Sequence, residues 1–234
     1  MTAAVEQLKI EIPFNKEHTV IQGGRIAFLW VGHDEHASNP LTDCDAMGSI
    51  WSFGRRHSNF KNPDEIFKDP SAPTESPFLR DYRDSVLLSY FEHGNCIWGV
   101  RGTLSDTPDF RWDGVSIAGI WTPDECLRKE LKTVKPQDRY AKLREWASQA
   151  CEAYTAWCNG EVYAYGVRGY ELRKDQDGTP WEESTDYRRS EALVEESCCG
   201  FVGHSSMKYM LGDCMAPIVK DALLLEEAPE LSVT

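Results

Sequence analysis

The pattern of apolar and polar positions predicts a series of short strands. Apolar or alternating runs of strand length recur along the chain, each bounded by turn residues such as Gly, Asn or Asp. The predicted strands cover residues 25–31, 49–53, 86–91, 95–100, 115–121 and 161–171, with another from Leu193 onward and a loosely alternating stretch within 1–12. Three of them follow one another closely between residues 84 and 121, which favours a continuous sheet there.

A different pattern predicts one long helix over about residues 137–158. Apolar residues recur there at intervals of three and four, and Asn159-Gly160 is a typical helix stop. The recurring residues are Tyr140, Leu143, Ala147, Ala150, Cys151, Tyr154 and Cys158. We interpret this stripe as a core-facing side. A shorter helix is predicted after Thr122-Pro123-Asp124-Glu125, with Thr122 as its cap, and two more are predicted at 206–211 and 218–227.

Strands come first, then a helical pair, then strands again. This order predicts an α+β fold with a mostly antiparallel central sheet and the helix at 137–158 packed on one face. The length of 234 residues fits one large domain. We therefore expect a single domain over residues 1–221, followed by an acidic C-terminal tail over 222–234.

The charge limits the classes of partner. The chain has 38 acidic and 25 basic residues, a net charge of −13. This balance argues against direct nucleic-acid binding, which needs cations to neutralise phosphates, and it fits a solubilising surface or an acidic face for a basic partner. No apolar run reaches the roughly 18 residues of a membrane span, and no secretory signal pattern is visible. We expect a cytoplasmic protein.

The eight cysteines form no Cys-x-x-Cys motif. In a cytoplasmic chain they are expected to be reduced and mostly buried thiols. Cys198-Cys199 is the one vicinal pair in the sequence, and a vicinal disulfide or soft-metal site there remains an alternative.

Three polar residues at strand ends are candidates for acid–base chemistry. Glu92 and His93 end the run at 86–91, and Asp113 precedes the run at 115–121. A histidine beside carboxylates is a reasonable acid and base set. No nucleophile motif, phosphate loop or metal signature accompanies them, so we favour a hydrogen-bonded cluster that fixes the strand ends. An enzyme is not the preferred prediction, and no cofactor is expected.

The remaining candidates lie in polar loops. The histidines and carboxylates between His33 and His57 match no zinc-ligand spacing, so a solvated acidic loop is expected instead of a metal site. Arg55 and Arg56 either pair with nearby aspartates or form an anion site, and pairing is favoured. The predicted binding residues are Asp43, Asp45, Arg55, Arg56, Glu182, Glu183 and Asp186.

Five segments, in order, resemble an uncharacterised protein family encoded by phages and prophages. Residues 39–57 resemble its NPR turn, DNLG-like step and His-Arg-Arg ending, and the later segments are similar to its YLYDHSG, WDSGQVGFI, YLTGDVYGF and DSCWGFYG. These later segments are residues 88–94, 112–120, 154–165 and 196–203. Leu41, Glu92 and Cys199 replace an arginine, an aspartate and a tryptophan of the family. The resemblance implies a mobile-element genome, with no established activity.

Together these observations predict a phage or mobile-element accessory protein that acts in the host cytoplasm without catalysis. It would bind and inhibit a host protein, for example a nucleic-acid-binding defence complex, through an acidic surface. One alternative is an enzyme or a small-ligand or nucleotide-binding protein with a pocket at Glu92, His93, Asp113, Arg55 and Arg56. Another is a virion accessory component. The oligomeric state is left open.

Overall fold

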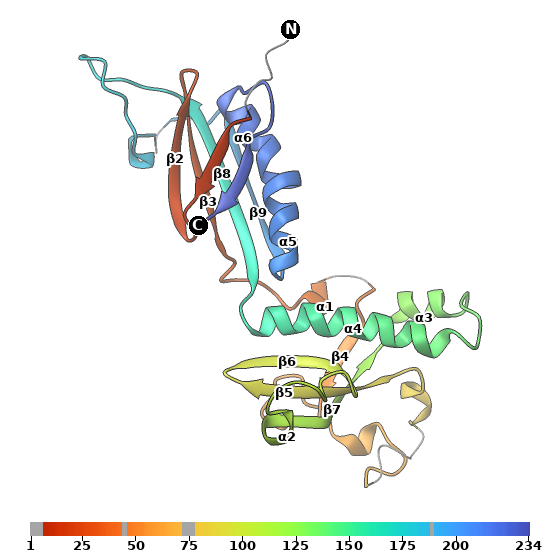
Figure 1. The fold of residues 1–234 in the computed structure, drawn as a ribbon. Helices are drawn as coiled ribbons and strands as arrows, with labels where there is room; N and C mark the ends of the chain where they lie inside the picture. The colour runs from red at the N-terminus through yellow and green to blue at the C-terminus, as the bar shows by residue number, and fades with distance from the viewer. Residues whose placement is uncertain (1–6, 44–45, 72–77, 188–189) are drawn as a thin grey trace. The chain divides into compact units, whose positions relative to one another are not determined.

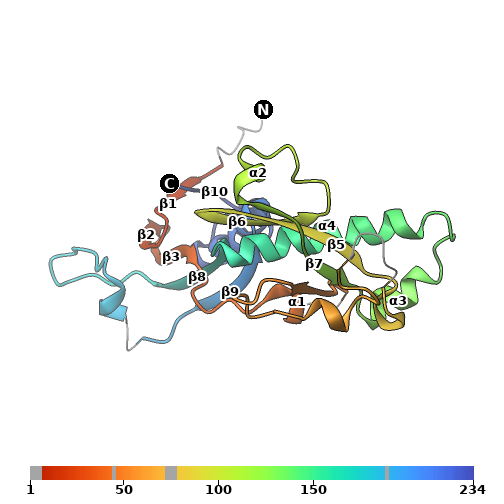
Figure 2. The same cartoon turned by 90° about the horizontal axis from the view of Figure 1, so that it is seen from below.

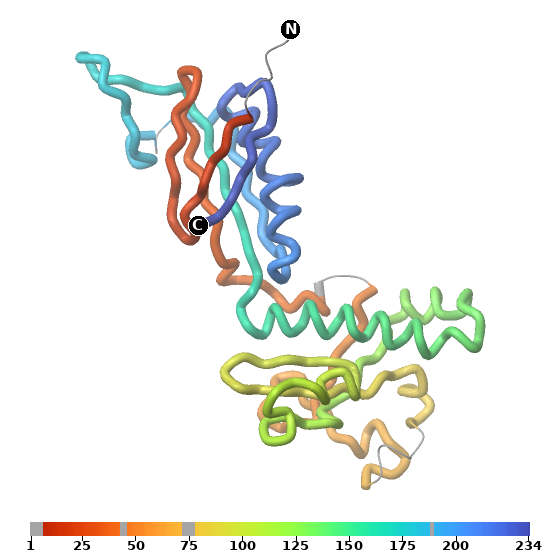
Figure 3. The backbone as a smooth tube through the Cα atoms, in the orientation of Figure 1, coloured from red at the N-terminus to blue at the C-terminus, as the bar shows by residue number. Residues whose placement is uncertain are grey.

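The chain forms two compact units. The computed structural model describes residues 7–43, 46–71, 78–187 and 190–234, apart from the side chain of Asp43. Unit 1 combines Met1–Ala37 with Gly160–Thr234, and unit 2 is Ser38–Asn159. Figure 3 follows the chain from red to blue: both ends build unit 1, and the orange-to-green middle is inserted as unit 2. The predicted single domain over 1–221 differs from this division, because local periodicity does not reveal which distant segments share a core.

Unit 1 contains a four-stranded antiparallel sheet. Its order is β2-β3-β8-β9, formed by Lys16–Gln22, Arg25–His33, Val162–Glu171 and Val194–Val202. A separate parallel pair joins the two chain ends, with β1 (Lys9–Ile12) beside β10 (Glu230–Val233), as Figure 2 shows. Residues 222–234 are therefore not a tail: they complete helix α6 and supply strand β10.

Three helical segments cover one face of the unit 1 sheet (Figure 1). They are α5 (His204–Tyr209), the π-helix η4 (Met210–Met215) and α6 (Ala216–Leu223). Met210, Met215 and Val219 share a core cluster with Leu29 and Val167 of the sheet. On the other face, the 3-10 helix η3 (Ser184–Tyr187) inserts a fully buried tyrosine.

Unit 2 contains a second antiparallel sheet of four strands. Its order is β4-β7-β5-β6, formed by Ser49–Ser52, Gly114–Thr122, Val86–His93 and Asn95–Val100. The short helices are α1 (Pro40–Asp43), η1 (Pro63–Glu65), η2 (Arg80–Tyr82) and α2 (Phe110–Asp113). The longer ones are α3 (Glu125–Leu131) and α4 (Arg139–Cys158). Each strand lies within two residues of its predicted position.

Helix α4 supplies much of the unit 2 core. Its buried residues Leu143, Ala147 and Cys151 share a cluster with Leu88 and Trp121 of the sheet. The predicted apolar stripe is thus buried along its middle, while Tyr140 at one end is 62% exposed and Cys158 at the other is also exposed. Apolar burial stabilises by about 25 cal/mol per Å², so this stripe anchors the helix.

The start of α3 differs from the prediction. Asp124, not Thr122, is the cap: its Oδ1 accepts a hydrogen bond from the Leu127 amide at 2.9 Å. Its Oδ2 also accepts from the Gly48 amide at 3.2 Å. Thr122 instead ends β7, where its hydroxyl accepts from the Trp51 indole at 3.3 Å. Helix α3 begins at Glu125, so Asp124, the residue directly before it, occupies the capping position, and Thr122 lies too early in the chain.

The α+β class with antiparallel sheets is confirmed. The prediction of a single central sheet is wrong, because the strands divide into two four-stranded sheets and one parallel pair. Within the described residues, no helix is both long enough and apolar enough to cross a membrane.

Candidate functional site

A cavity of about 450 Å³ lies in unit 2. This volume is within the range of roughly 300–1,000 Å³ that is usual for small-ligand sites. Its walls come from the loop after β4, the hairpin of β5 and β6, and the C-terminal end of α4. The residues that line it include His57, Tyr90, Glu92, Cys96, Trp98, Tyr154, Trp157 and Cys158.

Aromatic rings form a continuous wall of this pocket. The ring centroids of Tyr90 and Trp98 are 4.7 Å apart, and those of Trp98 and Tyr154 are 6.1 Å apart. Trp157 stacks on Tyr154 at 5.6 Å with an interplanar angle of 25°. His57 packs edge-on against Tyr90 at 5.1 Å. Trp98 is only 4% exposed, so its position is fixed by the core behind it.

Glu92 is the one carboxylate that lines the pocket among the described residues. The Tyr90 hydroxyl donates a hydrogen bond to its Oε2 at 2.8 Å. Burial, together with this bond, raises the pKa of Tyr90 above the ordinary tyrosine value. The tyrosine therefore keeps its proton at neutral pH and holds the carboxylate at the pocket.

Two thiols meet at the same place. Hydrogen bonding between the Cys96 and Cys158 side chains lowers the pKa of Cys96 and raises that of Cys158. Asn159 fixes this arrangement from the end of α4: its Oδ1 accepts from the Cys96 amide at 3.0 Å, and its Nδ2 donates to the Cys96 carbonyl at 2.9 Å. Thr155 similarly accepts from the Trp98 amide at 2.9 Å. Because β6 is an edge strand, these side chains cover backbone groups that would otherwise stay unpaired.

His57 also contacts a buried serine. The Ser52 hydroxyl lies 2.7 Å from His57 Nδ1 and accepts a hydrogen bond from the Gly54 amide at 3.0 Å. A serine and a histidine at this distance can form a nucleophile and base pair if a third group orients the ring. No carboxylate among the described residues makes a hydrogen bond to His57, and Ser52 is fully buried. The pair therefore fixes the loop after β4.

The predicted trio of Glu92, His93 and Asp113 is divided. His93 Nδ1 lies 2.9 Å from Asp113 Oδ2 in a pair that is exposed to solvent, with 71% and 38% of the two side chains accessible. The hydrogen bond that His93 donates to Asp113 raises the pKa of His93. Glu92 points to Tyr90 instead, because neighbouring residues of a strand project to opposite faces. Neither His93 nor Asp113 lines the pocket.

The predicted loop residues lie in separate places. Arg55 and Arg56 are exposed, and neither makes an ion pair with a described carboxylate. Asp45 and the Asp43 side chain, their expected partners, lie outside the described residues. Glu182, Glu183 and Asp186 are exposed in unit 1, so the predicted binding set is split between the units.

No cluster suited to a metal ion is present in the described parts of the chain. His33, the first histidine of the polar segment, ends β3 and stacks on Tyr163 with centroids 5.5 Å apart. Cys198 and Cys199 are free and exposed on β9.

The chain matches no family model, no curated protein and no solved structure.

Sequence reasoning missed most of the pocket. Tyr154 is only 5% exposed, so its assignment to the core is correct, but its ring also contributes to the cavity wall. The useful signal was the aromatic ending of the long helix, Tyr154 to Asn159, combined with the aromatic strands at 90–98. The spatial meeting of Cys96 and Cys158, far apart in the chain, has no local signal.

Proposed function

We propose that the protein is a binding protein whose unit 2 pocket takes a cationic group, such as an alkylammonium or a guanidinium. The observation that carries this proposal is the composition of the wall: several aromatic rings, one carboxylate and, among its described lining residues, no Lys or Arg. Aromatic faces attract cations by about 0.5–2 kcal/mol each, and more strongly where water is excluded.

Glu92 determines the sign of the preferred ligand charge. Its carboxylate favours a cation and opposes a phosphate or carboxylate ligand. The hydrogen bond from Tyr90 keeps the carboxylate in place before a ligand arrives, which reduces the ordering that binding requires. Binding is favoured over catalysis because Ser52 and His57 lack an orienting acid among the described residues and because the His93–Asp113 pair lies outside the pocket.

Isothermal titration calorimetry with choline and with arginine amide tests this proposal. We expect saturable binding, and we expect Glu92→Gln to weaken it by about tenfold, equivalent to roughly 1.4 kcal/mol. The matched control is Asp113→Asn, which removes one carboxylate of the same unit outside the pocket and should alter the affinity by less than about twofold. Equal affinities in the parent protein and the Glu92→Gln variant, or no saturable binding of either probe, would overturn the proposal.

A second candidate function follows from the surface of unit 1. By sequence, its two segments hold 20 acidic and 10 basic residues, whereas Ser38–Asn159 holds 18 and 15. Within the described part of unit 1, the ion pairs are Lys9–Glu230 and Glu17–Arg168. The remaining described carboxylates, including Glu182, Glu183 and Asp186, are not neutralised by ion pairs. Their negative charge produces an electrostatic field that steers basic partners toward unit 1.

We therefore propose as the second candidate a mobile-element accessory protein that inhibits a basic host protein, for example a defence complex, in the host cytoplasm. It is supported by this charge and by the resemblance to the phage and prophage family. The test is recovery of one partner from host lysate at about 50 mM salt, with loss at about 500 mM. The triple variant Glu182→Gln, Glu183→Gln and Asp186→Asn should lose the partner.

The control for this experiment neutralises three exposed acids of unit 2. The triple variant Glu130→Gln, Asp138→Asn and Glu152→Gln removes the same number of negative charges from exposed helical and loop positions. It should retain the partner. Equal recovery with both triple variants would contradict an acidic binding surface on unit 1, and copurification with phage particles would favour a virion component instead.

A further inference from the structure

A second hollow of unit 2 has the opposite charge. It has a volume of about 630 Å³ and lies where the segment after η2 meets α3 and the start of α4. Five cationic residues line it, against the two acids Asp84 and Glu125. The cations are Arg83, Arg128, Lys129, Lys132 and Arg139. We call this hollow the basic groove.

The two best-fixed cations of the basic groove are held by backbone carbonyls. Arg128 donates from Nε to the Pro123 carbonyl at 3.0 Å. Arg139 donates from Nε to the Val134 carbonyl at 3.1 Å and from Nη2 to the Lys132 carbonyl at 3.5 Å. Carbonyl partners orient a guanidinium without cancelling its charge, so both side chains stay available for an anion.

Carboxylates neutralise little of the basic groove. Within the described residues, its one ion pair is Lys129–Glu125 at 2.9 Å, between side chains that are 69% and 84% exposed. Pairs this exposed are weak, about 0–1 kcal/mol, and an incoming anion competes with them readily. Arg83 and Lys132 have no described carboxylate within ion-pair distance.

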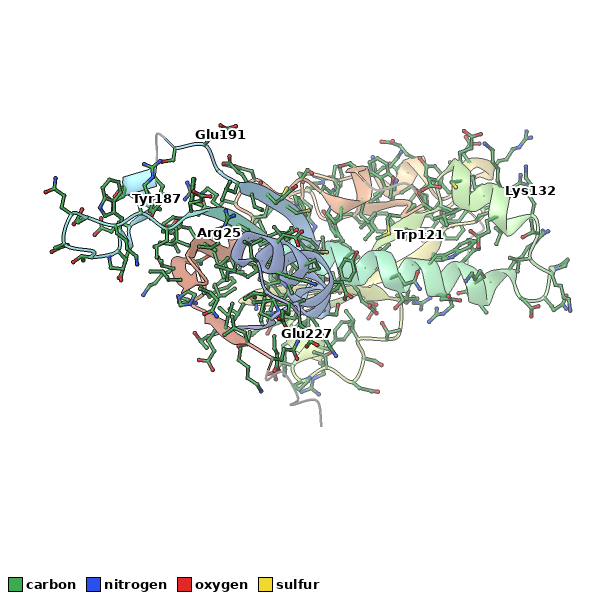
Figure 4. The ribbon with its side chains drawn as sticks, turned by 90° about the horizontal axis from the view of Figure 1, so that it is seen from above. Arg25, Trp121, Lys132, Tyr187, Glu191 and Glu227 are labelled. Carbon is green, nitrogen blue, oxygen red and sulfur yellow. The ribbon has the colours of Figure 1, made fainter. Side chains whose placement is uncertain are left out.

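The positive charge continues beyond the basic groove. Residues 128–144 contain seven basic and two acidic residues. Near the end of this stretch, the Arg144 guanidinium lies 5.9 Å from the ring centre of Tyr140, which is 62% exposed. Figure 4 shows Lys132 at the end of the α3–α4 hairpin, away from the labelled core residue Trp121. Cations combined with an exposed ring are the features that bind nucleic-acid backbones and bases.

We propose that the basic groove binds the phosphate backbone of a nucleic acid. The net charge of −13 argued against such a ligand, but that charge belongs mainly to unit 1, and residues 128–144 are locally positive. Guanidinium groups match phosphate oxygens with two parallel hydrogen bonds. The proposal concerns a different site from the aromatic pocket and does not depend on it.

Fluorescence anisotropy with labelled DNA and RNA oligonucleotides of about 20 nucleotides tests the proposal. At about 50 mM salt the full-length protein should bind, with an affinity that falls as salt rises. The double variant Lys129→Glu and Lys132→Glu should weaken binding at least about tenfold. It should also lower the slope of log affinity against log salt by about 0.7–0.9 for each lost phosphate contact.

The control makes the same change of charge elsewhere in unit 2. Arg101→Glu with Arg111→Glu reverses two exposed cations outside the groove and should retain affinity within about threefold. Equal losses in the two double variants, or no binding at low salt, would overturn the proposal. Displacement of the oligonucleotide by inorganic phosphate at low millimolar concentration would also overturn the proposal, because the ligand would then be a small phosphate. Displacement by polyglutamate as effective as that by unlabelled nucleic acid would overturn it too, because the groove would then bind any polyanion.

Discussion

Units 1 and 2 have similar architectures but differ in the charge of their residues. Both place helices on an antiparallel sheet of four strands. Unit 1 has twice as many acids as bases, whereas unit 2 is nearly balanced. Unit 2 also holds the aromatic pocket and the basic groove. A whole-chain net charge therefore averages two units whose charge differs.

The two units also differ in which parts of the chain complete their cores. Unit 1 depends on its chain ends, because β1 and β10 pair with each other and β1 contributes Ile10 and Ile12 to its core. Unit 2 is continuous in sequence, and α4 reaches its edge strand through Thr155 and Asn159. The two units should therefore respond separately to changes in their cores.

The largest expected effect is that of Trp121→Ala. Trp121 is fully buried in unit 2, and its indole donates to the Met47 carbonyl at 2.8 Å. Loss of a buried aromatic side chain should lower the free energy of unfolding by about 3–5 kcal/mol. Hydrogen exchange should show faster exchange in unit 2 with little change in unit 1. Phe28→Ala, a change at a buried residue of unit 1, should give the reverse pattern, and equal loosening of both units by either variant would contradict their independence.

Asn159→Ala should have an intermediate effect that is confined to the pocket. It removes both hydrogen bonds to the Cys96 backbone and leaves an edge-strand amide and carbonyl without that partner. We expect a loss of about 1–3 kcal/mol in denaturant unfolding and faster amide exchange at Cys96. Asn95→Ala, at an exposed position of the same strand, is the control. An equal loss of stability in that variant would argue against a specific role of the two Asn159–Cys96 hydrogen bonds.

A smaller effect is expected for the ion pair of unit 1. Arg168 Nη2 lies 2.7 Å from Glu17 Oε2, with both side chains more than one third exposed. Arg168→Ala should therefore lower the free energy of unfolding by no more than about 1 kcal/mol, and less at high salt. A loss that stays large at high salt would show that the side chain contributes through packing instead.

The smallest effect concerns pH. The pKa of His93 is raised by the hydrogen bond and the charge of Asp113. The stabilisation from this pair is fully present below the ordinary histidine pKa of about 6.5 and is lost as pH rises through the higher folded value. NMR titration should show a lower His93 pKa in Asp113→Asn, while Asp106→Asn should leave it unchanged. An unchanged value in Asp113→Asn would contradict the pairing.

Most elements of each unit could be predicted from sequence, but strand β2 (Lys16–Gln22) was not, and neither was the assembly of the elements. Strand β6 and the long helix α4 were accessible because their apolar patterns are local. Strand β10 was missed since Glu230–Val233 is short, and its partner lies at the other end of the chain. Glu92 could be named as a candidate from its strand-end position, whereas the pocket that it lines, and its separation from His93, became visible only in the structure.

The most direct test of the central claim is a comparison of two ligands with the same shape and different charge. Choline and its neutral analogue 3,3-dimethyl-1-butanol differ at one atom, nitrogen for carbon, so the charge is the main variable at the pocket of Tyr90, Glu92 and Trp98. Calorimetric titration should show that choline binds at least about tenfold more tightly, a difference of roughly 1.4 kcal/mol. Equal affinity, or tighter binding of the alcohol, would contradict a pocket that is selective for cations.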